Sequence, residues 1–280
     1  MQVEEHDGYL YEKGEDYIAT VRFNRPERMN GTNAWMHRDL RDTMTAIQYD
    51  DDVRVLILIG EGRAFCAGDD GGLSGHPRGG VRKPPPSKRR EPINTYGSLR
   101  HASQEVTVAL RKLDKLSIAA INGFAIQTGL SMALACDFRI AAEEARLGSA
   151  TLRFGFQPDE GGHWLLVQHL GVARAMDFLM RKRIVTAKEA LELGLVNEVC
   201  PLAELEGRAR ALAAELAAGP QTAMRLLKRS VYLAASLPLE MALDDIAART
   251  AVSDHHPDAR EGVAAWREKR APQFNRDVGS

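Results

Sequence analysis

The first sixty residues switch between the two periods of regular secondary structure. Two runs of strand-forming residues, 9–11 and 17–23, flank the turn-forming segment 13–16, which predicts a β-hairpin over 9–23. Four apolar side chains then recur at helical spacing: Met36, Leu40, Met44 and Ile47. Thr32 or Asn33 can cap this helix, and a mostly apolar run over 53–59 follows it. The pattern predicts a β-α-β unit.

The same alternation continues to about residue 200 and then stops. Strand-like runs at 117–121 and 138–141 enclose a helical pattern. From residue 202 onward almost every segment is helical, with breaks at Gly219-Pro220 and Pro238. We therefore expect an α/β core over 1–200 and a helical C-terminal subdomain over 201–280.

One long stretch of the core has little to bury. Residues 71–98 are rich in glycine, proline and basic side chains and contain the run Pro84-Pro85-Pro86. Such a composition cannot offset the entropy of ordering. We predict a flexible loop over 71–98.

Composition and charge favour a small-molecule partner. The 280 residues are 44% hydrophobic and 27% charged, as in globular domains, and the formal net charge of -1 gives no reason to expect nucleic acid or an acidic membrane. No apolar run approaches membrane-helix length, and residues 1–7 lack a secretory signal, so a cytoplasmic location is expected. Three scattered cysteines indicate neither disulfides nor a metal site: Cys66, Cys136 and Cys200.

Candidate chemistry lies in two glycine-bearing turns, 64–70 and 121–129. Each follows an apolar strand-like run, and the second leads into a helical pattern. A strand that ends at such a turn and restarts as a helix leaves backbone N–H groups unpaired, and these donors can bind a developing negative charge. Two such turns that converge on one carbonyl would form an oxyanion hole.

Five segments in order along the chain resemble the enoyl-CoA hydratase/isomerase, or crotonase, family. They are 24–30, 65–70, 121–125, 136–137 and 260–270. The resemblance implies an α/β fold with a crotonase-like ββα spiral core, a homotrimer or a dimer of trimers (a homohexamer) assembled through the C-terminal subdomain, and an acyl-CoA thioester substrate. It implies no cofactor beyond the coenzyme A of the substrate. The pair His255-His256 does not form an HExxH zinc motif, so no metal site is predicted.

The resemblance also assigns site residues. The hole is expected to use the backbone N–H groups of Ala67 and Thr128. Substrate or coenzyme A contacts are assigned to Arg28, Ala64, Gly68, Asp70, Gly129, Ser131, Thr151, Trp266 and Lys269, the last two through a neighbouring chain. The second turn reads Gln127-Thr128-Gly129 where the family usually has consecutive glycines, so a position there with positive φ would be strained.

The choice of reaction depends on carboxylates. Hydratases of the family use two glutamates, and their positions hold Ser131 and Thr151 here. Instead, Asp159 and Glu160 directly precede Gly161-Gly162 and a helix. Each matches the acid of one isomerase branch of the family, and a single carboxylate suffices to carry a proton from C2 to C4 of a 3-enoyl thioester.

Three alternatives stay open. Either acid can serve the helix N-terminus, as a cap or against the helix dipole. The acids can also activate water for hydration or hydrolysis of an unusual acyl-CoA. A member without turnover would only bind acyl-CoA. Double-bond isomerisation with Glu160 or Asp159 as the proton carrier is the favoured hypothesis.

Overall fold

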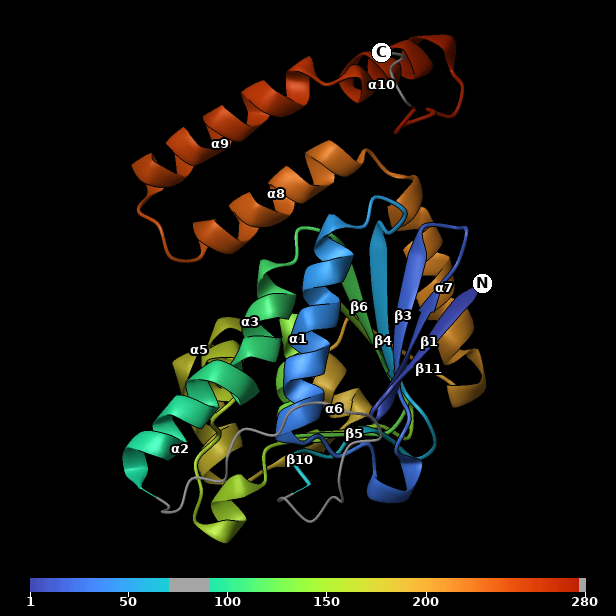
Figure 1. The fold of residues 1–280 in the computed structure, drawn as a ribbon. Helices are drawn as coiled ribbons and strands as arrows, with labels where there is room; N and C mark the ends of the chain where they lie inside the picture. Colours follow the sequence, from blue (N-terminus) through green and yellow to red (C-terminus); the bar gives the residue numbers. More distant parts are fainter. Residues whose placement is uncertain (71–90, 277–280) are drawn as a thin grey trace.

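The computed structural model describes residues 1–70 and 91–276, which form two β-sheets enclosed by helices (Figure 1). The seven-stranded sheet contains, in spatial order, β1 (Gln2–His6), β2 (Tyr9–Lys13), β3 (Ile18–Phe23), β4 (Val55–Gly60), β6 (Leu116–Ile121), β8 (Phe138–Ala142) and β11 (Glu198–Cys200). The four-stranded sheet contains β10 (Ile184–Thr186), β9 (Arg146–Gly148), β7 (Phe124–Ile126) and β5 (Ala64–Cys66).

The helical elements of the described residues fall into a core group and a C-terminal group. The core group is η1 (Pro26–Arg28), α1 (Ala34–Tyr49), α2 (Pro92–Ser98), η2 (Leu99–Ser103), α3 (Gln104–Lys112), α4 (Thr128–Ala135), η3 (Thr151–Phe154), α5 (Gly162–Met180) and α6 (Ala187–Glu192). The C-terminal group is α7 (Leu202–Ala218), α8 (Gln221–Ala234), α9 (Leu239–His255) and α10 (Pro257–Glu268).

The expected ββα spiral is confirmed. The chain forms three successive strand pairs: β4–β5, β6–β7 and β8–β9. In each pair the first strand belongs to the large sheet and the second to the small sheet, and a helical segment follows. The predicted hairpin is β2–β3, which pair antiparallel. The predicted cap of α1 is Asn33, whose side chain accepts hydrogen bonds from the N–H groups of Trp35 and Met36.

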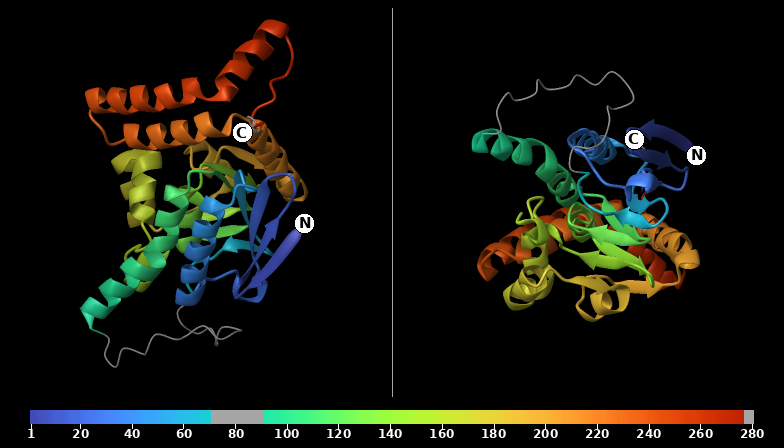
Figure 2. Two further views of the ribbon diagram at one scale, coloured as in Figure 1. Left: turned by 45° about the horizontal axis from the view of Figure 1, so that its top comes forward. Right: turned by 90° about the horizontal axis from the view of Figure 1, so that it is seen from below.

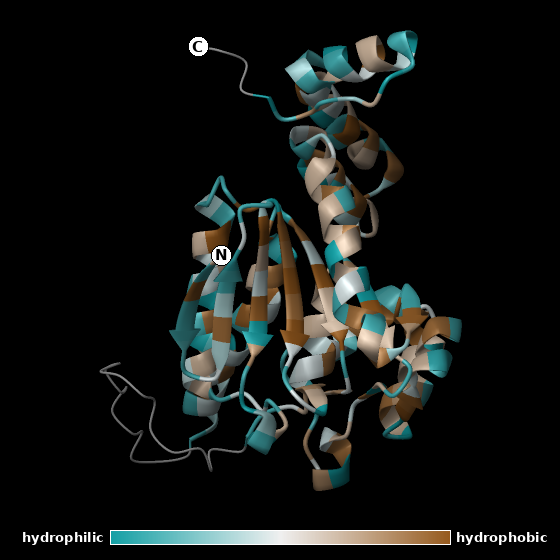
Figure 3. Cartoon of the chain, turned by 90° about the vertical axis from the view of Figure 1, so that its right-hand side faces the viewer, coloured by the Kyte–Doolittle hydropathy of each residue, from teal (hydrophilic) through white to brown (hydrophobic). Residues whose placement is uncertain are grey.

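The middle strands of the large sheet are buried on both faces, whereas the edge strand β1 is exposed. Leu56 and Leu58 of β4 pack in the cluster that contains Leu40 of α1. The alternate residues, such as Ile57, pack in a second cluster with Leu205 of α7. Figure 3 shows the apolar residues concentrated in the middle strands of this sheet. After Cys200 the regular elements of the described residues are all helices, as the sequence predicts. The first of these helices, α7, nevertheless packs on the large sheet and belongs to the core of the α/β part.

The last three helices lie outside the two sheets. α8 and α9 pack side by side, and α10 extends the pair away from the core (Figures 1 and 2). The helix breaks fall at Gly219-Pro220 and Pro238 as predicted, because Pro220 and Pro238 occupy the caps of α8 and α9. No helix within the described residues is both long enough and apolar enough to cross a membrane.

The predicted loop over 71–98 is partly wrong. Residues 71–90 lie outside the described residues. Residues 92–98 form α2, which continues through the π-helical turn η2 into α3. Sequence patterning missed this helix because none of its residues is buried, so it lacks an apolar face. Its start does carry a signal, since Pro92 occupies the first turn.

Candidate active site

The two predicted turns lie against each other. β5 pairs in parallel with β7, and the helix α4 begins two residues after β7. The contact is so close that a Cβ added at Gly129 would lie 1.9 Å from the carbonyl oxygen of Cys66. A Cβ added at Gly68, where φ is 103°, would lie 3.4 Å from Gln127 Cβ. The N-terminus of α4 is thus packed directly on the end of β5.

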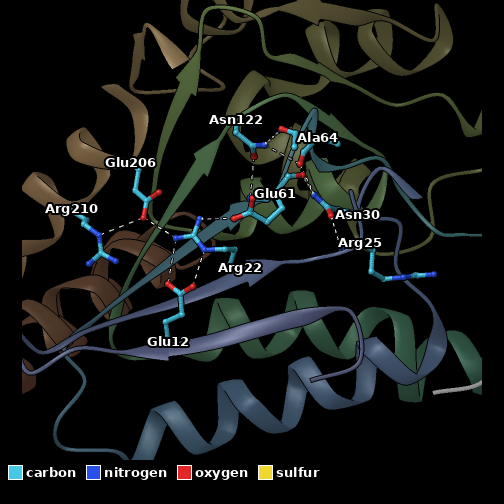
Figure 4. A network of polar contacts seen from close by, with 11 residues as sticks. Glu12, Arg22, Arg25, Asn30, Glu61, Ala64, Asn122, Glu206 and Arg210 are labelled. Carbon is cyan, nitrogen blue, oxygen red and sulfur yellow. Dashed lines mark hydrogen bonds and ion pairs between the residues drawn. The ribbon is translucent and has the colours of Figure 1, made fainter. Parts of the chain in front are cut away.

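Two buried asparagines hold the turn before β5 (Figure 4). Asn30 Nδ2 and Asn122 Nδ2 donate to the carbonyl oxygen of Ala64 at 2.7 and 3.1 Å, and Asn122 Oδ1 accepts from the N–H of Gly60 at 3.1 Å. These asparagines come from the sequence segments 24–30 and 121–125 noted above. Both asparagines therefore hold the carbonyl group of Ala64, which is the first residue of the turn 64–70, in a fixed position.

The backbone hydrogen bonds exclude Ala67 as a free donor. The Ala67 N–H donates to the carbonyl oxygen of Met29 at 3.0 Å. By contrast, neither Gly68 nor Asp69 donates its N–H to any residue within 1–70 or 91–276. The structure therefore corrects the predicted donor of the first turn, because sequence position alone does not show that the Ala67 amide is paired with a segment 38 residues earlier.

In the second turn the N–H of Thr128 is unpaired among the described residues, as a donor there requires. Such a free N–H is expected in the first turn of a helix. Gln127 on one side donates its N–H to Gly148 O, and Ser131 donates to Gln127 O. The free N–H groups at the start of α4 bring the positive end of the helix dipole to this point.

Gln127 occupies the strained position that the sequence suggested for this turn. Its φ and ψ are 53° and -108°, a conformation that favours glycine. The side chain is hydrogen-bonded through both ends of its amide: Oε1 accepts from Ser149 Oγ at 2.9 Å and Thr151 Oγ1 at 3.2 Å. Nε2 donates to Glu160 Oε2 at 3.2 Å. Sequence reasoning noted this residue only as a departure from glycine and missed its contact with the acid.

Glu160 is the most deeply buried acid of the site. It is 2% exposed, and burial, followed by the neighbouring carboxyl of Asp159 and the charge of Asp69, raises its pKa to about 8. The hydrogen bond from Gln127 acts in the opposite direction. A carboxyl group with a pKa near the working pH is suited to taking up and returning a proton.

Helix capping does not explain the two acids. The cap of α5 is Gly161, with φ of 90° and no side-chain hydrogen bond. Asp159 is half-buried, and its carbonyl oxygen accepts a hydrogen bond from Gln104 Nε2 at 2.8 Å. Both acids precede the cap, so neither supplies the capping oxygen.

The two positions that carry glutamates in hydratases hold hydroxyl groups without a carboxylate. Ser131 Oγ is buried on α4, has no hydrogen-bond partner among the described residues, and faces the Cα of Gly162, where a Cβ would lie 2.7 Å away. Thr151 on η3 donates to Gln127, so it supports Glu160 indirectly. Neither side chain ionises near neutral pH, which removes the paired-glutamate route to water addition.

Asp69 is a third acid beside the hole, and sequence reasoning missed its role. Its carboxylate accepts from Thr32 Oγ1 at 2.6 Å and Thr128 Oγ1 at 3.1 Å, and it lies 3.2 Å from Nε2 of buried His37. Although Asp69 is partly exposed, the protein around it still removes water and so opposes its ionisation; the contacts with His37, Thr32 and Thr128 outweigh this effect and lower the pKa of Asp69. The Thr32 and His37 contacts join segments that are far apart in sequence, so no local motif announces them.

The other predicted contact residues are spread over the molecule. Asp70, assigned above to substrate contacts, forms an ion pair with Arg25 at 2.8 Å and so holds the first turn. Arg28 is exposed on η1. Trp266 on α10 is 80% exposed, Lys269 caps the same helix, and α10 lies at the opposite end of the molecule from β5 (Figure 1). A single chain therefore does not bring Trp266 and Lys269 to the hole.

Other chemistry at the site is limited by burial and spacing. Cys66 is a buried free thiol, and burial raises its pKa to about 12, so it is not a thiolate nucleophile. Within the described residues, no group of three or more His, Cys, Asp and Glu side chains is placed to hold a metal ion.

Comparison with known proteins decides the family. The family model for enoyl-CoA hydratase/isomerase matches residues 13–277. The chain belongs to the enoyl-CoA hydratase/isomerase family. It is 35% identical to a probable enoyl-CoA hydratase of Rhodobacter capsulatus over 257 residues, which cover 92% of this chain and 94% of the relative. It is also 35% identical to 1,2-epoxyphenylacetyl-CoA isomerase of Escherichia coli over 264 residues, which cover 94% and 95%.

Solved structures agree with this assignment. The crystal structure of an enoyl-CoA hydratase from Bacillus anthracis matches with a TM-score of 0.85 at 29% identity, over 95% of this chain and 98% of that one. The family of enzymes and the crotonase-like fold are thereby confirmed, and an acyl-CoA substrate is consistent with them. Relatives of equal identity carry different reactions in their names, so family membership does not select the reaction.

Proposed function

We propose that this family member moves the double bond of a 3-enoyl-CoA thioester to the 2-position, with Glu160 as the proton carrier. One observation carries the proposal: the buried Glu160 carboxyl is hydrogen-bonded to Gln127, the residue directly before the free N–H of Thr128 at the start of α4. The side chain of Gln127 thus connects the carboxyl group of Glu160 to the anion-binding N-terminus of α4.

The oxyanion donors that we propose are the N–H groups of Thr128 and Asp69. Thr32 pairs with the first turn through Gly68 O and the Asp70 N–H, and these two bonds flank Asp69. In extended backbone successive N–H groups point to opposite sides, so the Asp69 N–H faces away from Thr32. The Asp69 side chain contacts Thr128, which places the two residues next to each other.

The reaction needs only one carboxylate. Glu160 in its ionised form takes a proton from C2 of the thioester, and the C2–H electrons form an enolate whose oxygen accepts from the two amides. The same carboxyl group returns the proton to C4, and the C3–C4 double bond becomes the C2–C3 double bond. No water is consumed, in keeping with the hydroxyl residues Ser131 and Thr151 at the hydratase positions.

The test is conversion of a 3-enoyl-CoA by the wild-type protein. We expect the absorbance of the conjugated 2-enoyl thioester to grow with time. If the protein instead removes that absorbance when supplied with 2-enoyl-CoA, it is a hydratase, and release of free coenzyme A thiol would identify a hydrolase. Calorimetric binding of acyl-CoA without any product would identify a non-catalytic member.

The pH dependence of this reaction is expected to follow the buried acid. Only ionised Glu160 accepts a proton, so kcat/KM should fall about tenfold per pH unit below a pKa of about 8 and level off above it. Asp159→Asn removes the neighbouring carboxyl that helps to raise the pKa of Glu160, so the acid limb should move to lower pH. Steady-state rates between pH 5.5 and 9.5 check this, with the buffer series as control. Loss of all activity in Asp159→Asn would instead make Asp159 the proton carrier.

We also propose that the chain forms a homotrimer or a dimer of trimers through its C-terminal helices. α9 has no buried residue, although it carries large apolar side chains. These are Leu239, Met241, Leu243, Ile246 and Val252. In such an assembly a neighbour's α10 could bring Trp266 and Lys269 to the coenzyme A nucleotide, with Arg28 as a further candidate contact.

The mass in solution tests the assembly. We expect light scattering to give three or six times the subunit mass of 30.9 kDa. Ile246→Glu should lower that mass, because a charge would be buried in the interface. Arg208→Glu, on the exposed side of α7, is the control. A wild-type protein that runs as a monomer at all concentrations would contradict the proposal.

A further inference from the structure

Two consecutive residues connect the two acids that flank the proposed hole. Gln127 directs its side chain to Glu160, and Thr128 directs its side chain to Asp69. The second contact joins the start of α4 to the turn after β5, because Thr128 Oγ1 lies 3.1 Å from Asp69 Oδ1. The residues that carry the two proposed amide donors are therefore linked by their own side chains.

The Asp69 end of this link is anchored on a third segment. Thr32 Oγ1 donates to the same carboxylate oxygen at 2.6 Å, and Thr32 also forms the backbone bridge to Asp69. His37 Nε2 of α1 lies 3.2 Å from that oxygen, and the imidazole is only 1% exposed. Asp69 thus cannot shift toward or away from α4 without breaking contacts on α1 and the segment before it.

We infer that Asp69 is a positioning residue whose carboxylate, through Thr128 Oγ1, sets the separation of the two amide donors. The inference rests on the proposed function in one respect, which is that these donors are the N–H groups of Asp69 and Thr128. It explains why a threonine stands at the first position of α4: its hydroxyl supplies a link that glycine lacks.

The electrostatic cost of this arrangement is limited by its surroundings. A free carboxylate beside the hole would repel an enolate oxygen, since like charges a few ångströms apart raise each other's energy. Here Thr32 and Thr128 donate to the carboxylate, and His37 is in contact with it. All three contacts are made to Asp69 Oδ1, so this oxygen is engaged by protein groups, while the backbone N–H of Asp69 is left for the substrate.

The test removes the link without removing either amide. Thr128→Val keeps the shape and the N–H of Thr128 but deletes the hydroxyl, and Thr128→Ser restores a hydroxyl. Asp69→Ala removes the carboxylate at the other end of the Thr128–Asp69 hydrogen bond. The variant that carries both Thr128→Val and Asp69→Ala completes a double-mutant cycle. The probe is cinnamoyl-CoA, whose absorbance moves to longer wavelength when its thioester carbonyl is polarised by hydrogen bonds, whether or not any reaction occurs.

We expect wild-type protein to shift the cinnamoyl-CoA absorbance and Thr128→Val to lose at least half of that shift, which Thr128→Ser recovers. For a 3-enoyl-CoA, Thr128→Val should lower kcat roughly 10- to 100-fold, because misplacement of a donor by about 1 Å can cost that much, while KM changes little. Asp69→Ala should lower the absorbance shift and kcat in the same way as Thr128→Val. In the double variant kcat should be no lower than in the poorer single variant.

A variant elsewhere separates positioning from folding. Thr43 is buried and its Oγ1 hydrogen-bonds Tyr9 OH at 2.7 Å, so Thr43→Val should lower the melting temperature without changing the absorbance shift. A normal shift and normal kcat in Thr128→Val, or full additivity in the double variant, would overturn the inference alone. A wild-type protein that binds cinnamoyl-CoA without any shift would overturn the proposed donors, and the inference with them.

Discussion

Glu160→Gln should lower the turnover of 3-enoyl-CoA by about 10³-fold, because the amide cannot accept the C2 proton. The variant keeps the size of the side chain, and its amide oxygen can still accept from Gln127 Nε2. The two amide donors are untouched, so the affinity for an acyl-CoA should stay within a few fold. The measurement is kcat from the growth of conjugated thioester absorbance, with calorimetric binding of a saturated acyl-CoA beside it.

Glu160→Gln is expected to remain folded, so a lower turnover can be assigned to the missing carboxylate. Because the pKa of Glu160 rises from its ordinary 4.5 to about 8 in the folded protein, the unfolded chain releases this proton at lower pH than the folded one. Wild-type stability should therefore fall as pH rises between these values, and Glu160→Gln lacks that loss. At pH 8 the variant should melt no earlier than wild type. Unchanged turnover in a folded variant would eliminate Glu160 as the proton carrier.

Gly129→Ala should destabilise the protein by about 3 kcal/mol and remove activity, because the added methyl group has no space. Its Cβ would lie 1.9 Å from Cys66 O and 2.8 Å from Cys66 C, both backbone atoms. The start of α4 must then move away from β5, which separates the two halves of the hole. Urea unfolding gives the free-energy change, and cinnamoyl-CoA absorbance reports the hole in the protein that stays folded.

Gly207 supplies the matched control for this change. It lies in the helix α7, is exposed, and has no atom within 4 Å of an added Cβ. Gly207→Ala should be neutral or stabilise the protein by up to about 1 kcal/mol, because alanine favours the helix. Equal stability of Gly129→Ala and wild type would show that α4 and β5 are not in fixed contact.

Much of the fold followed from local patterns. The β2–β3 hairpin, the α1 helix with its Asn33 cap and the proline-marked breaks of the C-terminal helices each arise from residues close in sequence. The α2 helix was missed, since its side chains are exposed and leave no periodic signal. Local periodicity reports burial against a core, so it fails where an element has no buried face.

The same distinction divides the site. The chain by itself determined that two glycine-bearing turns and two adjacent acids exist, since these are runs of neighbouring residues: 64–70, 121–129 and 159–160. Only the tertiary structure decided which groups are free to act. It showed that Met29 occupies the N–H of Ala67, and that Gly161 caps α5.

The tertiary structure also decided the hydrogen-bond partners and the pKa values of the acids. Gln127 reaches Glu160 across 33 residues, and Thr32 and His37 reach Asp69 across 37 and 32 residues. A carboxyl group is the same in any sequence, but its pKa depends on the water it loses and the donors it gains on folding. Sequence therefore determined the types of chemical group at this site, whereas long-range packing determined which amide is unpaired and which carboxyl holds its proton.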